Sequence, residues 1–196
     1  RAYRKIAQCY GPIHGLVHSA IVLDDQGLAS IDEDRFRAGL AAKMDVSVRI
    51  AQVFQHEALD FVLFFSSLQS FSKNPGQSNY AAGCTFTDAF AHYLARHWSC
   101  AVKVMNWGYW GGTGVVASQD YQARMTRAGV GSIEPREGMD ALAFLLNGSL
   151  DQVALMKTVD ARPAHNTRAR KVPEGEGGRG VATTIVPAPE STPAPP

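Results

Sequence analysis

The sequence predicts an α/β fold built on a sheet of parallel strands. Four short apolar runs are typical of buried strands: IHGLVHSA (13–20), FVLFFSS (61–67), AVKVMNWG (101–108) and QVALMK (152–157). Their hydrophobicity is nearly continuous rather than alternating, as in strands that are covered on both faces. Helical patterns lie between them, and strands that alternate with helices favour parallel pairing through right-handed crossovers.

Three longer helices are expected between and after these strands. Residues 33–56 begin within DEDRF, whose acidic residues suit a helix N-terminus, and carry apolar residues on one face. Lys43 lies within that face, in GLAAKMDVSV, where an unpaired lysine would be costly. Residues 77–97 and 135–147 complete the set, and Pro135 suits a first helical turn.

Composition excludes several classes of function. The 196 residues are 45% hydrophobic and 19% charged, enough for one domain with a core. The net charge of +1 is spread evenly, so neither nucleic acid nor a membrane surface is expected as a partner, and no apolar run is long enough to span a bilayer. The cysteines and histidines show no metal-ligand spacing and no disulfide framework, so we expect no metal and a cytoplasmic location.

The composition changes near Pro163. Seven of the ten prolines lie in 163–196, and no aromatic residue does. We therefore predict a folded part, residues 1–162, followed by a disordered Pro/Gly-rich linker, residues 163–196. GEGGRG within the linker follows no strand and opens no helix, so it is not interpreted as a nucleotide-binding loop.

Ser67 and Tyr80 are the first candidates for chemistry. Ser67 ends a predicted strand and Tyr80 begins a predicted helix, and in an open parallel sheet ligands bind at this edge. A phenol exchanges a proton more readily if a nearby ammonium lowers its pKa, and Lys43 is the candidate. Taken singly, the three residues suit backbone bonding, packing and a snorkelling lysine. Their combination favours an active site.

The combined pattern resembles a known family. FRAGLAAKMDVSVRIAQVF, LDFVLFFSSLQSFSKNPGQSNYAAG and VKVMNWGYWG are similar to the ketoreductase domains of modular polyketide synthases, members of the short-chain dehydrogenase/reductase superfamily. The resemblance runs from about residue 1 to 160. GQSNYAAGCTFTDAFAHYLA has the form found in synthases that lack integrated acyltransferases. The fold implied is the C-terminal portion of a Rossmann-like, doubly wound parallel sheet.

The resemblance implies catalytic roles. Tyr80 would protonate the ketone oxygen, Ser67 would hydrogen-bond the same oxygen, and Lys43 would lower the pKa of the tyrosine and bind the nicotinamide ribose of NADPH. The fourth catalytic position, normally asparagine, is Cys84 here. A thiol is a weak donor and acceptor, so we interpret Cys84 as a small buried residue rather than a replacement.

The resemblance also implies a cofactor wall and a substrate entrance. Besides Lys43 and Tyr80, the residues expected at the cofactor are His18, Ser19, Asn106, Trp107 and Gly108. Those expected at the substrate entrance are Leu23, Asp24, Asp25, Gln77, Tyr109 and Trp110. The Leu-Asp-Asp motif implies a D-configured β-hydroxyacyl product, since the opposite class carries a tryptophan where this chain has Ser72.

A glycine-rich turn after a first strand, which would hold the pyrophosphate, is missing; GGTG at 111–114 follows a late strand. We therefore expect the N-terminal half of the reductase to be supplied from elsewhere. The other expected partners are an acyl carrier protein bearing a β-ketoacyl chain and further synthase domains. Two alternatives stay open: a non-catalytic structural or docking remnant, and a stand-alone dehydrogenase, which the absence of a lysine four residues after Tyr80 disfavours.

Residues 112–131 combine glycines with an amphipathic stretch at 119–128. A segment of this kind after the nicotinamide-binding strand suits either a mobile lid over the acyl chain or an ordinary surface helix.

Overall fold

The structure is a computed structural model, and it forms two compact units, Arg1–Val104 and Met105–Pro196. The residues that it describes are 2–72, 74–113, 119–159, 170–171 and 183–187. None of the helices in these described ranges is long and apolar enough to cross a membrane.

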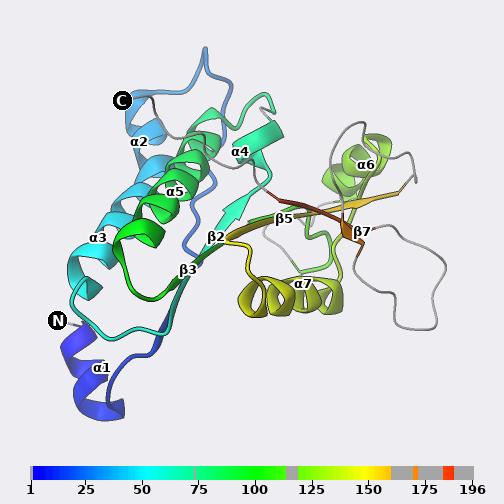
Figure 1. The fold of residues 1–196 in the computed structure, drawn as a ribbon. Helices are drawn as coiled ribbons and strands as arrows, with labels where there is room; N and C mark the ends of the chain where they lie inside the picture. The colour runs from blue at the N-terminus through cyan, green and yellow to red at the C-terminus, as the bar shows by residue number, and fades with distance from the viewer. Residues whose placement is uncertain (1, 73, 114–118, 160–169, 172–182, 188–196) are drawn as a thin grey trace, which may run out of the picture. The chain divides into compact units, whose positions relative to one another are not determined.

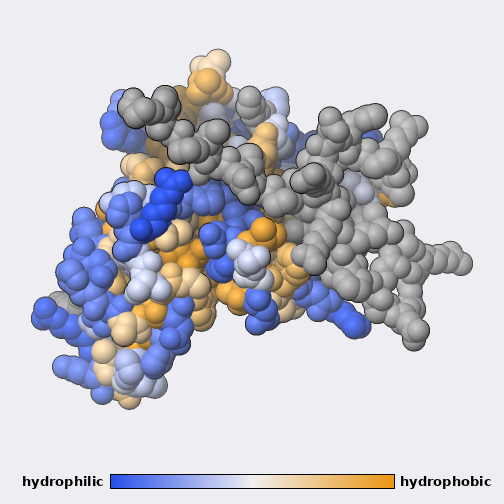
Figure 2. All heavy atoms as spheres, viewed as in Figure 1, coloured by the Kyte–Doolittle hydropathy of each residue, from blue (hydrophilic) through white to orange (hydrophobic). Residues whose placement is uncertain are grey.

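The first unit packs helices against the start of a parallel sheet. Its elements are α1 (Ala2–Tyr10), β1 (Gly15–His18), α2 (Glu33–Ala41), α3 (Met44–Phe54), β2 (Phe61–Ser67), α4 (Gln69–Ser72), α5 (Ser78–His97) and the first residues of β3 (Ala101–Trp107). Strands β1 and β2 pair in parallel, with Gly15 opposite Phe61 and His18 opposite Phe64. Figure 1 shows α2, α3 and α5 side by side, and hydrophilic residues predominate over α3 in Figure 2.

Strand β2 is the centre of the core in this unit. Val62, Leu63 and Phe64 are each at most 1% exposed, although successive residues of a strand point to opposite faces. Val102 and Val104 of β3 and Leu94 of α5 belong to the same buried cluster as Val62 and Phe64. This burial explains the continuous apolar run, and the predicted bounds of the strand, 61–67, are confirmed.

The prediction of one helix over residues 33–56 is wrong. Helix α2 ends at Ala41 and α3 begins at Met44, with Lys43 at the junction. The Lys43 amide donates to the Leu40 carbonyl at 3.0 Å, a tight i to i−3 contact that interrupts the regular helix. Lys43 therefore lies between two helices rather than on the apolar face of one.

The second unit contains the rest of β3, α6 (Gln119–Arg127), β4 (Val130–Gly131), α7 (Pro135–Asn147), β5 (Gln152–Thr158), β6 (Arg170–Lys171) and β7 (Thr183–Pro187). Helix α7 begins at Pro135, as predicted, and Glu134 and Glu137 form a capping box at its N-terminus. Strand β5 pairs antiparallel with both β4 and β7.

The sheet is mixed and not purely parallel. The α/β class and the parallel pairing of the first two strands are confirmed, but the antiparallel strands β4, β6 and β7 were not expected. Of the predicted linker, only 170–171 and 183–187 are described, as short strands. The rest of 163–196 lies outside the described residues, so the linker stays a prediction.

Helix α2 packs closely on α5 at Gly39. A Cβ at Gly39 would lie 2.6 Å from Nδ2 of Asn79, which is fully buried and donates to the Asp24 carbonyl at 3.2 Å. The Asn79 amide cannot move aside without losing this bond, so a larger residue at position 39 must separate the two helices.

We expect Gly39→Ala to lower the free energy of unfolding by up to about 2 kcal/mol, since overpacking costs about 1–3 kcal/mol and the gain in helix propensity is about 1 kcal/mol. Gly27→Ala is the matched control, because its nearest neighbour would lie at 3.6 Å. Urea-induced unfolding of both variants measures the difference. Equal midpoints for the two would contradict close helix packing at Gly39.

Candidate active site

Lys43 is a buried cation at the carboxyl end of β2. Its side chain is 3% exposed, and its Nζ donates to the Phe65 carbonyl at 2.6 Å. The stem lies over Gly83 of α5, where a Cβ would be 3.1 Å from the Cβ of Lys43. Burial lowers the pKa of Lys43, while the nearby Cys84 and Asp88 act in the opposite direction. The helix junction, the strand and Gly83 together determine where the ammonium lies.

Tyr80 and Ser67 meet at the same end of β2, as the sequence predicts. Ser67 is the last residue of β2 and Tyr80 the third residue of α5, where it is 9% exposed. The Ser67 hydroxyl forms a hydrogen bond with the phenol of Tyr80. It also accepts a hydrogen bond from the Gln69 amide at 3.2 Å. The short helix α4 that follows β2 thus helps to hold the Ser67 side chain.

The pKa of Tyr80 does not shift in the expected direction. Burial raises it well above its ordinary value of 10, the neighbouring Cys84 acts in the same direction, and the hydrogen bond with Ser67 opposes the increase. Lys43, which was expected to lower this pKa, is not among the causes of the shift. A phenol with a raised pKa is fully protonated at neutral pH, which is the form that a general acid requires.

Cys84 is buried at the centre of this group. It is 0% exposed and lies one turn after Tyr80 on the same face of α5. Burial raises the pKa of its thiol, while Lys43 and hydrogen bonds from Tyr80 and Ser66 act to lower it. The expectation that Cys84 is a small buried residue is confirmed, and the thiol is neutral at physiological pH.

The Leu-Asp-Asp loop is tied to the start of α5. Gln77 donates to the Asp25 carboxylate at 2.6 Å, and Asn79 donates to the Asp24 carbonyl at 3.2 Å. Arg35 of α2 lies 3.7 Å from the Asp24 carboxylate. The structure therefore brings Asp24, Asp25 and Gln77 together immediately before Tyr80, and Leu23 is partly buried in the same loop.

The two predicted cofactor residues at the end of β1 differ in environment. His18 is 2% exposed, lies edge-on against Phe64 at 5.8 Å, and has Nε2 3.4 Å from the carbonyl oxygen of Lys43. Ser19 is exposed. His18 thus contacts Lys43 itself.

The remaining predicted site residues lie in the second unit. The amide oxygen of Asn106, at the end of β3, accepts a bond of 2.7 Å from the buried Gln152. Trp107 packs edge-on against Trp110, whose ring lies where a Cβ at Gly138 would clash. Tyr109 contacts Tyr121 of α6, and Gly108 is partly buried.

Helix α6 covers residues 119–127 of the predicted lid segment. Gln122 donates from α6 to the Gly111 carbonyl at 3.1 Å, which ties the helix to the loop after β3. Residues 114–118 lie outside the described residues, so lid motion stays a prediction.

The sequence analysis missed residues that support Lys43. Gly83 allows the lysine stem to pass over α5, and Ser47 donates to the Lys43 carbonyl at 2.6 Å. A signal existed for Gly83, because an isolated glycine inside a helical pattern often marks a close approach. No comparable signal distinguishes Ser47 from an ordinary helical serine.

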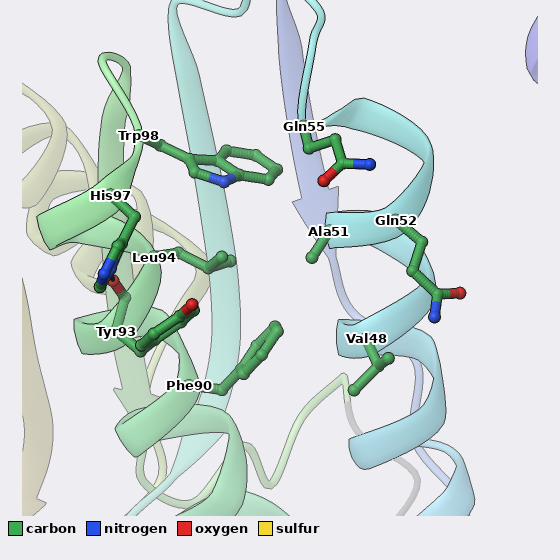
Figure 3. A pocket seen from close by; sticks show the side chains of 9 residues that line it. All are labelled: Val48, Ala51, Gln52, Gln55, Phe90, Tyr93, Leu94, His97 and Trp98. Atoms are coloured by element: carbon green, nitrogen blue, oxygen red, sulfur yellow. Dashed lines mark hydrogen bonds between the residues drawn. The ribbon is translucent and has the colours of Figure 1, made fainter.

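A groove of about 380 Å³ lies elsewhere on the first unit, between α3 and α5 (Figure 3). Phe90 and Leu94 of α5 and Val48 of α3 are among its lining residues. Phe90 follows Tyr80 by ten residues of α5, about 15 Å along the helix axis. The groove is therefore distinct from the group formed by Lys43, Ser67 and Tyr80.

Comparison with known proteins identifies the family. The KR domain model matches residues 1–112. The polyketide synthases PksN and PksM of Bacillus subtilis (strain 168) are 60% and 52% identical over 157 and 158 residues, which are 80% and 81% of this chain. The chain spans only 3% and 4% of those proteins.

A solved ketoreductase domain from the bacillaene assembly line superposes with a TM-score of 0.74 at 25% identity, over 79% of this chain and 39% of that structure. The match agrees with the α/β architecture and with the Rossmann-like fold expected from the sequence. The chain belongs to the KR domain family, the ketoreductase domains of polyketide synthases within the short-chain dehydrogenase/reductase superfamily.

Proposed function

We propose that this chain provides the catalytic wall of a reductase that converts carrier-protein-bound β-ketoacyl thioesters into β-hydroxyacyl thioesters with NADPH. The observation that carries the proposal is the grouping of Lys43, Ser67 and Tyr80 at one end of β2, within a chain of the KR domain family. The other residues expected at the cofactor, apart from the buried His18, and those expected at the substrate entrance belong to the same proposal.

The donor set suits the nicotinamide end of a dinucleotide. An ammonium has three N–H donors. Among the described residues, the Lys43 Nζ donates one of them to the Phe65 carbonyl. Two donors are thus left for ribose hydroxyl groups. NADPH, when bound, supplies the hydride that reduces the ketone carbon. Lys43 and Tyr80 would hold its ribose, with Asn106, Trp107 and Gly108 as further proposed contacts.

In this proposal the proton that the ketone oxygen receives comes from a side chain of this protein. Tyr80 holds its proton at neutral pH because burial raises the pKa of the phenol. The phenol O–H bond breaks as the proton passes to the ketone oxygen, whose negative charge develops as the carbon is reduced. The Ser67 hydroxyl donates to the same oxygen and stabilises that charge. The Lys43 ammonium then stabilises the phenolate until a proton from solvent restores Tyr80.

The substrate side of the proposal rests on the loop before α5. The bonds from Gln77 and Asn79 fix Asp24 and Asp25 beside the start of the catalytic helix, where they would form one wall of the substrate entrance. We infer entry of the acyl chain in the orientation that gives the D-configured product. The partners would be an acyl carrier protein and neighbouring synthase domains in the cytoplasm, and the cofactor phosphates would be held by a further part of the reductase.

The alternative is a non-catalytic structural or docking remnant. Cys84 in place of the usual asparagine favours it, because a buried neutral thiol orders a proton-relay water less well than an amide does. The burial of Lys43 favours a catalytic role. Burying an ammonium group lowers the stability of the fold, and a purely structural element would have no reason to keep it.

Tyr80→Phe tests the role of the phenol in an intact ketoreductase domain. We expect reduction of a β-ketoacyl thioester to fall by at least about 100-fold, because the variant lacks the proton donor. NADPH binding, measured by nucleotide fluorescence, should change less than about threefold, since the ring and its packing are kept. Tyr93→Phe, on the exposed side of α5, is the matched control. Reduction by Tyr80→Phe at the wild-type rate would exclude Tyr80 as the acid.

The configuration of the product tests the substrate entrance. Chiral chromatography of the β-hydroxyacyl product from an intact domain should show a dominant D-configuration, as the Leu23-Asp24-Asp25 motif implies. A dominant L-product would contradict the assigned direction of entry.

NADPH affinity tests whether another part of the reductase is needed. Without backbone N–H groups at a glycine-rich turn, several charge-assisted bonds of about 1.5–3 kcal/mol each are lost. We expect residues 1–196 alone to show no measurable NADPH binding by calorimetry and no reduction. Supplying a segment that carries a glycine-rich phosphate-binding turn, in cis or as a second chain, should restore both. Micromolar affinity for residues 1–196 alone would overturn this proposal.

A further inference from the structure

We propose that His18 and Ser47 are positioning residues that place the Lys43 ammonium by fixing the lysine's backbone carbonyl. The proposal rests on the proposed reductase function, because it concerns the geometry of the same site. It assigns His18 a role through Lys43 in place of direct cofactor binding.

The Lys43 carbonyl is a point where three donors converge. The Ser47 hydroxyl donates to it at 2.6 Å and the Ser47 amide at 3.1 Å. Nε2 of His18 lies 3.4 Å from the same oxygen. Both side chains are buried, with His18 at 2% and Ser47 at 0% exposure. Ser47 approaches from α3 and His18 from the end of β1, so the carbonyl is held from a helix and from the sheet.

The contacts of the imidazole define its tautomer. The Ala20 amide donates to Nδ1 of His18 at 3.3 Å, so Nδ1 acts as an acceptor and carries no proton. Nε2 then carries the proton and donates to the Lys43 carbonyl. Burial among Phe64 and its neighbours lowers the pKa of His18, which keeps the ring neutral beside the lysine.

Lys43 needs this support because it lies between two helices. The regular bonds of α2 end at Ala41, and Lys43 has φ −99° and ψ −55° at the N-cap of α3, without a side-chain cap. Its stem passes over Gly83, and its Nζ reaches the Phe65 carbonyl at 2.6 Å. The carbonyl contacts fix the backbone end and Phe65 fixes the ammonium end. A rotation of the junction would move the ammonium away from the Phe65 carbonyl and the end of β2.

The simplest alternative is that His18 and Ser47 only fill the core. A filling role requires volume and no particular donor, whereas a positioning role requires a donor at Nε2. His18→Leu replaces the imidazole with an apolar side chain of similar size and removes the donor. His18→Gln is the conservative variant, because its amide nitrogen can reach the place of Nε2. Ser47→Ala removes one hydroxyl, and Thr85→Ala is its matched control, since Thr85 makes the same i−4 contact, to the Ala81 carbonyl at 2.9 Å, on the exposed side of α5.

The experiment measures kcat and KM for a β-ketoacyl thioester in the intact ketoreductase domain. We expect kcat to fall by about 10- to 100-fold in His18→Leu, with KM within about twofold, because small displacements of a catalytic group carry losses of this order. His18→Gln should recover most of the loss. Ser47→Ala should lower kcat by about tenfold, and Thr85→Ala should not. In the double variant His18→Leu/Ser47→Ala the loss should be smaller than the product of the single losses, since both act on one carbonyl.

A second readout is independent of activity. The ¹⁵N spectrum of the wild-type domain at pH 7 should show His18 as a neutral ring protonated at Nε2, and a ring protonated at Nδ1 would overturn the proposal. An unchanged kcat in His18→Leu, or no recovery in a folded His18→Gln, would also overturn it. If His18→Leu does not fold, Ser47→Ala against Thr85→Ala decides in the same way. A wild-type domain without reductase activity would contradict the proposed function, and the ¹⁵N spectrum would then judge the His18 contact alone.

Discussion

The buried ammonium of Lys43 is the constraint on which the rest of the candidate site depends. Moving a charged group out of water costs several kcal/mol unless its hydrogen bonds are replaced. The chain meets this demand with the Phe65 carbonyl at the end of β2, a glycine on α5 beneath the lysine stem, and a break between α2 and α3 that directs the side chain inward. Each of these features would be a defect in an ordinary helix-on-sheet packing.

The same burial sets the protonation states of the neighbouring groups. Desolvation lowers the pKa of Lys43 and raises those of Tyr80 and Cys84, so it opposes charge on all three. Tyr80 is therefore protonated at neutral pH, and in the proposed reaction the cation of Lys43 would have its largest effect once a phenolate forms. This order suits a reductase, in which the tyrosine gives up a proton only as charge develops on the substrate oxygen.

Much of the site could be predicted from the sequence, because its elements have strong local signals. The apolar run ending at Ser67 and the helix carrying Tyr80 both lie where the pattern indicates. The break at Lys43 could not be predicted, since LAAKM (40–44) is continuous in helix-forming residues and the lysine contacts β2 and α5, which are distant in sequence. The direction in which the pKa of Tyr80 shifts could not be predicted either. The shift depends on how deeply the side chain is buried, and the spacing of residues in the sequence does not determine that. The antiparallel strands β4 and β6 have two residues each, too few for a periodic signal.

The most direct test of the central role of Lys43 is the single-turnover rate of β-ketoacyl reduction by Lys43→Met in the intact domain, with its thermal stability measured beside it. The account predicts a rate at least about 100-fold below wild type. Stability should be unchanged or higher, because an apolar side chain replaces a buried charge. A near-wild-type rate would contradict the account, and so would a loss of rate that is fully explained by unfolding.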